Sequence, residues 1–335
     1  MKILLICNYK PGVGGISGQV ESLQRNLREE NHTADIFSTK TSFFRRLMLP
    51  LRLRSKARNY DILHIHCCSG WGFLPAVVGV PVGRWLKKRI VVTYHGGGGE
   101  RFFDEHPQLV HYFLTRTDTN IVLSGFLARI FEKHHLSYTI IPNILEFDAA
   151  QYRVREKLLP HYICTRAHEP LYNISCILRA FQKVQEKLPE ARLTLVGDGS
   201  EHEFLMQLSE SLGVRNVTFT GRVDNGEIYQ QLDNADVFLS SPRVDNMPVS
   251  ILEAMNAGLL VISSRVGGVP YMVEDGETGL LFENDSDAGL SERMLWVVAN
   301  QKQAIHMIEN AHKAVEAYRW MNIKEKLYIS YGIPA

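Results

Sequence analysis

Short, nearly continuous apolar runs alternate with amphipathic stretches along most of the chain. The first run, residues 2–7, has the apolar character of a strand whose sheet is covered on both faces. Several of the stretches between the runs carry apolar residues at helical spacing. The pattern predicts successive α/β units, with further strands at 61–66, 89–94, 120–124, 139–143, 161–165, 191–196, 217–220, 237–240 and 259–263.

A polar stretch at 145–160 interrupts this alternation and is the candidate linker between two domains. The length of 335 residues exceeds that of one typical domain. Residues 1–150 carry a net charge of +7 and the remainder carries −6, which favours two domains with different partners. We therefore predict two doubly wound, Rossmann-like α/β domains with parallel sheets that face a cleft.

The overall composition is that of an ordinary globular protein, with 45% hydrophobic and 22% charged residues. The first apolar run is too short for a signal peptide, and the longest apolar region, 71–83, is shorter than the roughly 20 residues of a membrane span. We expect a cytoplasmic location. The five cysteines fall mostly in apolar runs and are interpreted as reduced core residues, and no Cys/His spacing is typical of a zinc site.

The segment 237–258 predicts a strand, a loop and a helix, and it carries two carboxylates. Apolar spacing predicts the helix, Pro248 fits its first turn, and Gly258 ends it. The N-terminus of such a helix lies at the carboxyl edge of the sheet, where its unpaired amides suit a phosphate group. Asp245 in the loop and Glu253 in the helix flank this end. The segment is therefore a candidate binding site for a phosphorylated ligand.

A glycine-rich loop, 11–18, follows the first predicted strand and precedes a predicted helix. The amides of Gly14 and Gly15 can approach a phosphate closely, although a tight strand–helix turn explains the pattern equally well. The loop lacks the Gly-x-Gly-x-x-Gly spacing of dinucleotide-binding proteins and the Gly-Lys-Ser/Thr of a Walker loop. Neither of those functions is therefore supported.

His95 stands directly after the predicted strand 89–94 and is followed by four glycines. Ligands of open α/β sheets bind at the carboxyl ends of strands, and glycines let a ligand approach closely. We therefore predict a functional role for His95. His64 and His66 share one face of another predicted strand, and we expect structural roles for both.

Residues 43–58 combine six basic residues with apolar ones and contain no acidic residue. This pattern is typical of an amphipathic surface element that faces anionic lipid or a phosphorylated acceptor. A solvated basic helix explains it equally well. Nucleic-acid binding is not expected, because the aromatic residues do not interleave with the basic ones as they do in a stacking surface.

The region 192–282 carries six motifs in a characteristic order: Val196-Gly-Asp-Gly199, Gly221-Arg222, Ala235-Asp-Val-Phe-Leu-Ser-Ser-Pro242, Leu252-Glu-Ala-Met255, Gly267-Gly-Val-Pro270 and Glu274-Asp-Gly-Glu-Thr-Gly-Leu-Leu281. With them, the region resembles the C-terminal domain of retaining family-4 glycosyltransferases (glycosyl transferases group 1) of GT-B fold. The N-terminal half is similar through shorter matches at Gly14-Gly15, His66, Thr93-Tyr-His-Gly96, Ser124 and Pro142-Asn143.

The resemblance implies a domain plan and an activity. It implies an N-terminal acceptor-binding domain over 1–148, a C-terminal nucleotide-sugar-binding domain over 160–312, and a last segment, 313–335, that crosses back to the first domain. The implied enzyme is a retaining glycosyltransferase of hexosyltransferase type that serves polysaccharide or glycolipid biosynthesis. It would move a sugar from a nucleotide-sugar donor to a glycan or lipid-linked acceptor.

The resemblance also assigns roles to single residues. The residues expected to be catalytic are Asp245, Arg166 and His95. The residues expected to bind the donor are Gly14, Gly15, Gly199, Val223, Met247, Val249, Ser250 and Glu253, with Val223 beside the nucleotide base. The family's Glu-x7-Glu signature is Asp245-x7-Glu253 here, in which the first carboxylate holds sugar hydroxyls and the second holds the ribose.

One departure from the family concerns the diphosphate site. Arg166 matches the family's diphosphate-binding arginine, but Tyr172 falls near the position of the lysine that usually follows. One cation is therefore missing, and His168 could replace it only in part. The carboxylate pair with Arg166 favours a reaction without a metal or a cofactor. We expect the leaving phosphate to take the acceptor's proton, and His95 to position the sugar or acceptor rather than act as a base.

Two other functions are compatible with these residues. One is a GT-B nucleotide-sugar epimerase or phosphorylase. The other is a catalytically weakened donor-binding subunit, which the missing lysine and the shorter Asp245 motivate. The expected partners are a nucleotide-sugar donor, a glycan or lipid-linked acceptor and an anionic membrane surface on the inner face, contacted through residues 43–58; no nucleic acid is expected.

Overall fold

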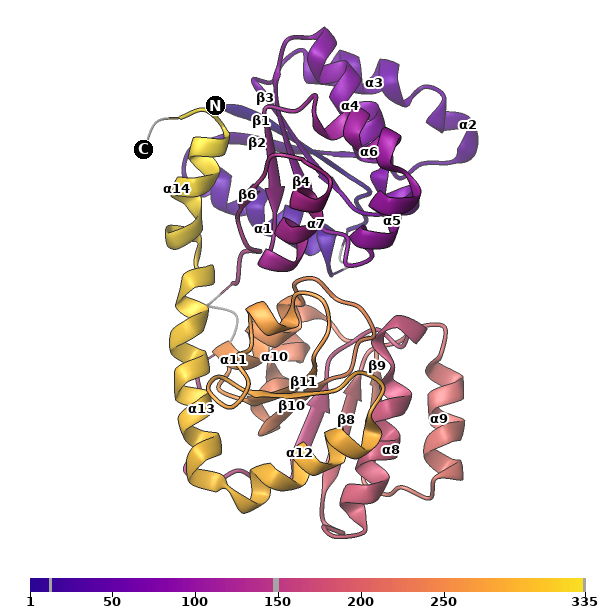
Figure 1. Ribbon diagram of the computed structural model, residues 1–335, viewed down its shortest axis with the longest axis vertical. Helices are drawn as coiled ribbons and strands as arrows, with labels where there is room; N and C mark the ends of the chain where they lie inside the picture. Colours follow the sequence, from indigo (N-terminus) through magenta and orange to yellow (C-terminus); the bar gives the residue numbers. More distant parts are fainter. Residues whose placement is uncertain (12–13, 147–150, 334–335) are drawn as a thin grey trace. The chain divides into compact units, whose positions relative to one another are not determined.

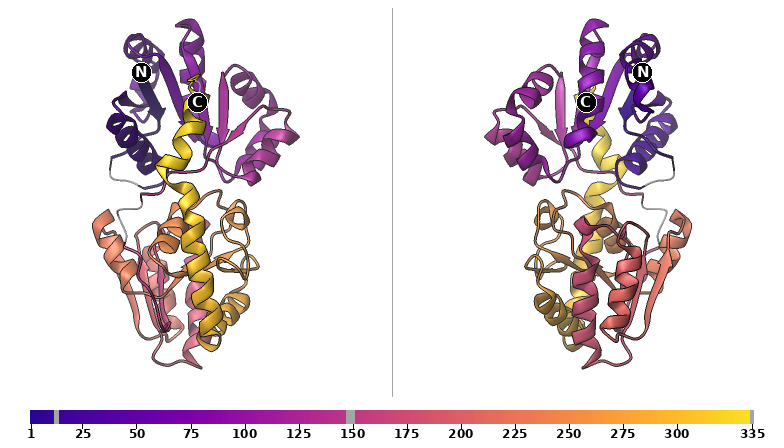
Figure 2. Two further views of the ribbon diagram at one scale, coloured as in Figure 1. Left: turned by 90° about the vertical axis from the view of Figure 1, so that its left-hand side faces the viewer. Right: turned by 90° about the vertical axis from the view of Figure 1, so that its right-hand side faces the viewer.

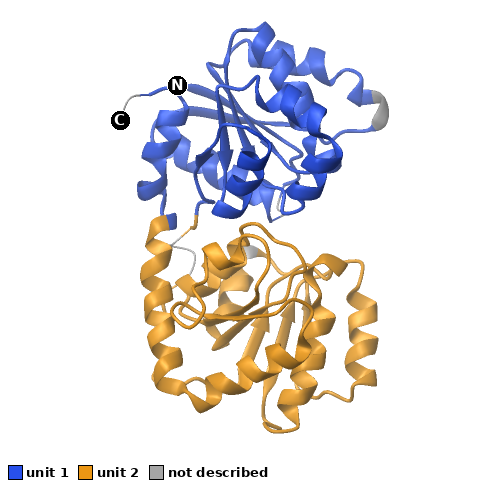
Figure 3. Cartoon of the chain, viewed as in Figure 1, with its two compact units in different colours: residues 1–144, 318–335 blue, residues 145–317 orange. Residues whose placement is uncertain are grey.

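The computed structural model describes residues 1–11, 14–146 and 151–333 (Figure 1). The chain divides into two compact units (Figure 3). Unit 1 contains residues 1–144 and 318–335, and unit 2 contains residues 145–317. Each unit has a six-stranded sheet of parallel strands with flanking helices, which confirms the α/β prediction (Figure 2).

The sheet of unit 1 has the strand order β2-β1-β3-β4-β5-β6, with every neighbouring pair parallel. Its strands are β1 (Lys2–Cys7), β2 (Thr33–Ser38), β3 (Ile62–Cys67), β4 (Arg89–Tyr94), β5 (Thr119–Val122) and β6 (Thr139–Ile140). The apolar pattern predicted all of these strands except β2. That strand lies at the sheet edge and is only partly buried, so it carries fewer apolar residues than a central strand.

Both faces of the unit 1 sheet are covered, which explains the continuous apolar run of β1. Leu4 and Ile6 lie in one apolar cluster with α3 (Leu49–Ala57) and α4 (Leu74–Trp85). Ile3 and Leu5, on the opposite face, pack with α1 (Ile16–Glu29) and α14 (Trp320–Ser330). The last helix of the chain therefore completes the core of unit 1. The remaining helices here are α2 (Phe43–Arg46), η1 (Gly70–Phe73), α5 (Gly99–Glu105), α6 (Pro107–Leu114) and α7 (Gly125–Lys133).

The sheet of unit 2 has the strand order β12-β11-β10-β7-β8-β9, again with parallel pairs. Its strands are β7 (His161–Cys164), β8 (Arg192–Val196), β9 (Val217–Gly221), β10 (Val237–Ser240), β11 (Leu260–Ser264) and β12 (Leu280–Phe282). The pattern missed β12, whose three residues are too few to show a period.

The helices of unit 2 alternate with these strands along the chain or follow them. They are η3 (Pro170–Tyr172), α8 (Ile174–Gln185), α9 (His202–Ser211), α10 (Asn225–Asp233), α11 (Val249–Asn256), η4 (Val269–Tyr271), α12 (Asp287–Ala299) and α13 (Gln301–Ala314). The short helix η5 (Val315–Tyr318) contains the position at which the chain passes from unit 2 to unit 1. The stretch before β7 is tied to this unit by Asp236. Its carboxylate accepts hydrogen bonds from the Arg155 guanidinium and from the backbone N–H of Leu159, both at 2.9 Å.

Each sheet has one point at which the connections reverse direction. In unit 1 this point lies between β1 and β3, and in unit 2 it lies between β7 and β10. The loops that leave the carboxyl ends of two such neighbouring strands run in opposite directions, and the crevice between them binds ligands in open α/β sheets. The strand order therefore points to the loops after β7 and β10 in unit 2.

Candidate active site

The loops after β7 and β10 bring three of the expected residues together in unit 2. Arg166 follows β7, and its guanidinium forms an ion pair with the carboxylate of Asp245 in the loop after β10. The other terminal nitrogen, Nη1, donates to Ser250 Oγ at 3.1 Å. The side chains of Arg166 and Asp245 are only 11% and 17% exposed, so little water competes with this pairing. A buried, hydrogen-bonded arginine at this edge is well suited to an anion.

Tyr172 lies where the resemblance led us to expect a lysine, and it contacts Arg166 directly. The guanidinium carbon of Arg166 is 4.0 Å from the centre of the Tyr172 ring, a cation–π arrangement. Burial opposes the charge of Arg166, but Asp245 and Tyr172 outweigh burial and keep the pKa of Arg166 above its usual value. Tyr172 therefore orients the one cation and does not add a second.

The loop that carries Asp245 is supported by the glycine pair after β11. Gly267 has a φ of +51°, and a Cβ at this position would lie 1.9 Å from the carbonyl oxygen of Asp245. The N–H of Gly268 donates to the same oxygen at 3.0 Å. Only glycine can approach the loop this closely. The Gly267-Gly268 motif thus holds Asp245 in place from behind.

Helix α11 begins directly after this loop. Pro248 occupies the N-cap position and the helix starts at Val249, so Pro248 precedes the first turn that we expected it to join. No side chain caps this end. The first amides of a helix have no partners within it, so those of Val249 and Ser250 face the carboxyl edge of the sheet as potential phosphate donors. Met247, the third expected residue in this stretch, is buried.

Glu253 lies one turn into α11 and close to the same group of residues. Burial raises the pKa of Glu253 to about 7, while the Tyr229 hydroxyl, 3.5 Å from Oε1, and the nearby Arg166 act in the opposite direction. The carboxyl therefore changes its protonation near neutral pH. The ionised form is the stronger acceptor at both oxygens, whereas the protonated form carries a donor on one of them, so a pair of donating ribose hydroxyls would favour the ionised form.

His168 does not supply the missing cation. Its side chain is fully buried, Nδ1 lies 2.8 Å from Nδ1 of His202, and burial lowers the pKa of His168 to about 4. The ring is therefore neutral at pH 7, so the expectation that His168 partly replaces the missing cation is not met.

Gly199 packs against the same segment, because a Cβ there would lie 2.4 Å from the carbonyl oxygen of His168. Val223 follows β9 and is partly buried.

The expected residues of unit 1 lie at the carboxyl ends of β1 and β4. Gly15 is the N-cap of α1 and has a φ of +66°, and Gly14 precedes it; residues 12 and 13 of the same loop lie outside the described part. His95 follows β4, and its Nε2 is 3.0 Å from Nδ1 of His66. Burial lowers the pKa of His95 to about 4, so its ring is neutral at pH 7.

The two histidines of β3 differ in their contacts. His64 has a structural environment, with Nδ1 at 2.8 Å from the Tyr331 hydroxyl and Nε2 at 2.8 Å from Thr93 Oγ1. His66 instead contacts His95, which sequence reasoning missed. A signal was present, since His66 is the histidine nearer the carboxyl end of its strand, where a neighbouring strand can bring a partner.

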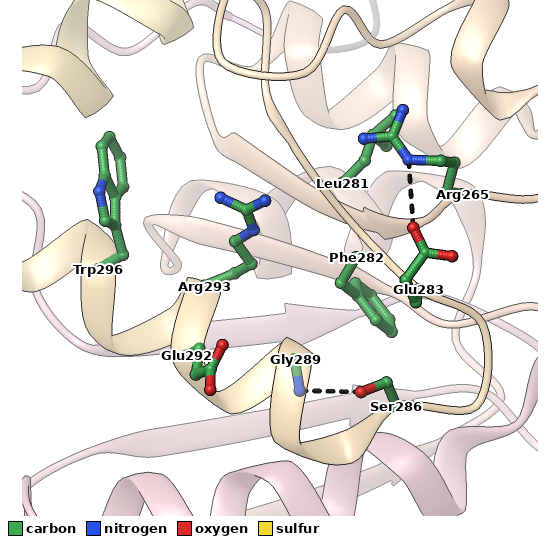
Figure 4. Close-up of a pocket in the computed structure, with 9 residues that line it drawn as sticks. All are labelled: Arg265, Leu281, Phe282, Glu283, Ser286, Gly289, Glu292, Arg293 and Trp296. Atoms are coloured by element: carbon green, nitrogen blue, oxygen red, sulfur yellow. Dashed lines mark hydrogen bonds and ion pairs between the residues drawn. The ribbon is translucent and has the colours of Figure 1, made fainter.

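Unit 2 has a hollow of about 430 Å³ that is lined by other residues (Figure 4). The lining contains none of the expected site residues, and both of its arginines pair with acidic groups: Arg265 with Glu283 at 3.7 Å, and Arg293 with Asp275 at 3.9 Å. The residues that line it are Arg265, Leu281, Phe282, Glu283, Ser286, Gly289, Glu292, Arg293 and Trp296. The candidate site is therefore an open edge of the sheet and not this hollow.

The acidic residues of unit 2 include a pair with the spacing of a metal-binding motif. The chain contains one Asp-x-Asp sequence, at Asp285 and Asp287. Asp285 accepts hydrogen bonds from Asn173 at 2.7 Å and Arg243 at 3.0 Å, whereas Asp287 pairs with Lys183 at 2.9 Å. Within residues 1–11, 14–146 and 151–333, no three His, Cys, Asp or Glu side chains are grouped so that they could hold a metal.

Models of known families match both halves of the chain. The model described as Glycosyl transferases group 1 matches residues 159–314, and the model described as Glycosyltransferase Family 4 matches residues 36–148. Together the two matches span most of the chain. The protein therefore belongs to the family-4 (group 1) glycosyltransferases.

Individual relatives agree with this assignment. The chain is 24% identical to N-acetyl-alpha-D-glucosaminyl L-malate synthase of Bacillus anthracis, over 99% of this chain and 96% of that protein. It is 27% identical to a GDP-mannose-dependent alpha-(1-6)-phosphatidylinositol monomannoside mannosyltransferase of Mycolicibacterium smegmatis, over 51% of this chain and 48% of that protein.

Solved structures show the same fold. HepE of Anabaena, in complex with UDP-glucose, superposes with a TM-score of 0.81 at 17% identity, over 99% of each chain. This likeness confirms the predicted GT-B fold class.

No helix within the described ranges is long and apolar enough to cross a bilayer.

Proposed function

We propose that this protein is a retaining, metal-independent glycosyltransferase of hexosyltransferase type that uses a nucleotide-sugar donor. The observation that carries the proposal is the group of Arg166, Asp245 and Ser250 at the open N-terminus of α11, with Glu253 one turn further on. One cation and several amides face the place where an anion would lie. In the proposed roles, Asp245 binds hydroxyls of the transferred sugar and Glu253 binds the ribose of the donor.

The chemistry follows from where charge develops. Breaking the bond between the anomeric carbon and the diphosphate leaves negative charge on the phosphate oxygens and positive charge on the sugar ring. Fixed donors aimed at the developing anion lower this barrier, by about 2–4 kcal/mol for a single well-placed donor. Arg166 and the amides of Val249 and Ser250 supply such donors. The leaving phosphate then accepts the proton of the attacking hydroxyl, so no separate protein base is required.

Arg166 and Asp245 must separate, at least in part, when a donor binds. In the structure the carboxylate of Asp245 is the anion that pairs with the Arg166 guanidinium. A diphosphate would take over the guanidinium and free the carboxylate to accept hydrogen bonds from sugar hydroxyls. The ion pair thus keeps both groups ordered before the substrate arrives, which reduces the entropy cost of binding.

The acceptor is proposed to be a glycan or lipid-linked molecule at an anionic membrane surface. Leu47 and Leu51 in the α2–α3 segment are 78% and 54% exposed, whereas Leu49 and Leu53 are buried in the core of unit 1. The exposed leucines lie among Arg45, Arg46, Arg52 and Arg54. Exposed apolar side chains with basic neighbours favour interfacial binding. The mannosyltransferase relative is named for a phosphatidylinositol-based acceptor, which supports this proposal.

The membrane proposal is tested by sedimentation with vesicles of phosphatidylglycerol and phosphatidylcholine. Binding to anionic vesicles is expected, with weaker binding after replacement of the four arginines by glutamine and at high salt, because each basic residue near the surface contributes about 1 kcal/mol. Vesicles of phosphatidylcholine alone are the control. Equal binding by the wild type and the glutamine variant would contradict the proposal.

The transferase proposal is tested first by thermal shift with a panel of nucleotides and nucleotide-sugars. A true donor at 100 times its dissociation constant should stabilise the fold by about 2.7 kcal/mol. The donor found in this way is then used to measure turnover by the wild type and by Asp245→Ala. We expect Asp245→Ala to lose turnover with the fold intact; unchanged turnover would remove Asp245 from the site.

Four further outcomes separate the alternatives. Loss of activity with a chelator, or a product of inverted configuration, would contradict the proposed mechanism. Tight nucleotide binding without turnover on any acceptor would indicate a donor-binding subunit. Release of free nucleotide without an acceptor would indicate an epimerase or a phosphorylase.

A further inference from the structure

Three histidine rings lie in contact at the carboxyl ends of β3 and β4 in unit 1. The centres of the His64 and His66 rings are 4.2 Å apart, and those of His66 and His95 are 5.3 Å apart. His64 and His66 are 1% and 4% exposed, and His95 is partly exposed. Among the described residues, one hydrogen bond joins rings of this cluster, between Nδ1 of His66 and Nε2 of His95 at 3.0 Å. The partly exposed ring is thus held by a fully buried one.

A single proton lies between the two facing nitrogens. Burial lowers the pKa of His66 and His95 well below the usual value, so both rings are neutral and each carries one proton. A hydrogen bond between two neutral imidazoles needs one N–H donor and one bare nitrogen. Either His66 donates from Nδ1 or His95 donates from Nε2.

The second nitrogen of His66 decides between these two arrangements. Nε2 of His66 is buried and has no hydrogen-bond partner in the described part of the chain. If His95 were the donor, the proton of His66 would lie on Nε2 as a buried N–H without an acceptor. Buried N–H groups without partners are rare in proteins because they lose hydration and gain nothing in return. The arrangement in which His66 donates from Nδ1 avoids this.

We propose that His66 is a positioning residue that donates from Nδ1 to Nε2 of His95 and thereby holds His95 as the Nδ1–H tautomer. The nitrogen of a histidine that faces a ligand is set by the hydrogen bond made on the other side of the ring. Nδ1 of His95 has no partner among the described residues, so it is available as a hydrogen-bond donor to an oxygen of a sugar or acceptor. This last step rests on the proposed function.

The surroundings of His66 fix its orientation. His64 packs against it with tilted ring planes and is itself hydrogen-bonded at both nitrogens, to Tyr331 and to Thr93. Thr93 is the residue of β4 that pairs with His66 in the sheet register. His95 is aligned by its backbone N–H, which donates to the carbonyl oxygen of Cys67 at 2.8 Å. The two rings therefore meet through backbone geometry that the sheet determines.

The first test needs no substrate. The protein is labelled with ¹⁵N-histidine, and ring nitrogen shifts are recorded by long-range ¹H–¹⁵N correlation, with His66→Asn and His95→Gln used for assignment. We expect Nδ1 to be the protonated nitrogen of His66 and of His95. Protonation of His95 at Nε2 in the wild type would overturn the proposal.

Variants then test whether His66 sets the tautomer. His66→Leu removes the donor, so His95 is expected to gain the Nε2–H form; His66→Asn places an amide N–H near the position of Nδ1 and should restore the Nδ1–H form. Tyr331→Phe is the matched control, because it removes a hydrogen bond from His64 and leaves the His66–His95 contact in place. A His95 tautomer that is the same in all four proteins would also overturn the proposal.

The kinetic consequence is measured with the donor identified by thermal shift. His66→Leu is expected to lower kcat/KM by about tenfold, the usual scale for one lost hydrogen bond, and His66→Asn to recover most of it. If the wild type shows the Nδ1–H tautomer but no turnover, the proposed function fails and the tautomer assignment stands. If turnover is present and His66→Leu leaves kcat/KM unchanged, the positioning role fails and the proposed function stands.

Discussion

Both units have a six-stranded parallel sheet, but the carboxyl edge of the sheet carries charged side chains in unit 2 and neutral histidines in unit 1. In unit 2 this edge carries a charged group, with Arg166 and Asp245 paired and Glu253 nearby. In unit 1 the same edge carries glycines and neutral histidines, of which His95 has a pKa lowered by burial to about 4. The sheets are alike, and the side chains after the strands differ.

The difference shows how a fold decides which groups keep their charge. Arg166 and His95 are both partly buried, but a carboxylate and an aromatic face lie against Arg166 and preserve its charge. His95 contacts a second imidazole, which cannot compensate a charge, so burial leaves it neutral. On the proposed function, the charged group of unit 2 would stabilise the leaving anion, and the neutral histidines of unit 1 would position hydroxyl groups through hydrogen bonds.

The largest expected effect comes from removing the charge in unit 2. Arg166→Met should lower kcat by about 10²–10³-fold, because one donor to the developing anion contributes about 2–4 kcal/mol. Arg166→Lys should retain part of this activity, since it keeps the charge but loses the forked geometry. Steady-state kinetics with the identified donor measures both. If Arg166→Met had the kcat of the wild type, the charge of Arg166 in unit 2 would not contribute to catalysis.

A stability control accompanies this variant, because Asp245 loses its partner when Arg166 is replaced. The double variant Arg166→Met/Asp245→Asn removes both charges and should recover stability without recovering turnover. Unfolding by urea separates the two effects. Recovery of turnover in the double variant would contradict the proposed role of Arg166.

The support behind Asp245 gives the next largest effect. Gly267→Ala combines a strained positive φ with a Cβ that would contact the Asp245 carbonyl oxygen, so we expect roughly 2–3 kcal/mol of lost stability. Turnover should fall further than stability alone explains, because the loop moves. Gly276→Ala is the matched control, with a φ of +83° but no atom within 4 Å of the added carbon. Equal effects of the two substitutions would show that the close approach is unimportant.

Glu253→Gln tests the titrating group of the site. The pKa of Glu253 is about 7 in the folded protein and 4.5 in its ordinary state, so this carboxyl stabilises the fold below pH 4.5 and loses that contribution as pH rises through 7. Relative to the wild type, Glu253→Gln should therefore gain stability between pH 5 and pH 8, by about 2 kcal/mol after allowance for partial exposure. Urea unfolding at several pH values measures the gain.

The same variant should bind nucleotide more weakly above pH 7, where the wild-type carboxylate is ionised and can accept two hydrogen bonds. Isothermal titration at pH 6 and pH 8 tests this. Wild-type affinity should rise with pH, and the affinity of Glu253→Gln should not. A pH-independent wild-type affinity would remove Glu253 from the nucleotide site.

The smallest loss of stability is expected in unit 1, from a substitution that changes no charged residue. Tyr331→Phe leaves Nδ1 of the buried His64 without its partner, which should cost about 1 kcal/mol of stability. Urea unfolding measures this loss. Tyr331→Phe should bind nucleotide as tightly as the wild type, since it alters none of the residues expected to bind the donor. A loss above that of Gly267→Ala would reverse the order predicted here.

Much of the fold was predictable because parallel strands covered on both faces carry continuous apolar runs. Residues 2–7 and 89–94 show this pattern and form β1 and β4 over the same bounds. The elements that escaped prediction, β2 and β12, are an edge strand with polar positions and a strand of three residues. Their place in the sheet comes from pairing with a neighbour, which no local pattern records.

The candidate site was predictable as a set of residues and not as an arrangement. Motif order singled out Arg166, Asp245 and Glu253, although 79 residues separate the first two. It could not reveal that Arg166 and Asp245 pair with each other, or that Tyr172 stacks on the arginine. It also left open a cationic role for His168, whose pKa is lowered to about 4 by burial beside His202.

The sequence by itself determined the two α/β units, the family and the residue types at the carboxyl edges of the sheets. Those features depend on periodicity and on motifs, which are local properties of the chain. Only the tertiary structure decided which groups are charged and which nitrogen of a histidine carries a proton. Ionisation and tautomer depend on desolvation and on partners contributed by distant segments, such as Asp245 for Arg166 and His66 for His95.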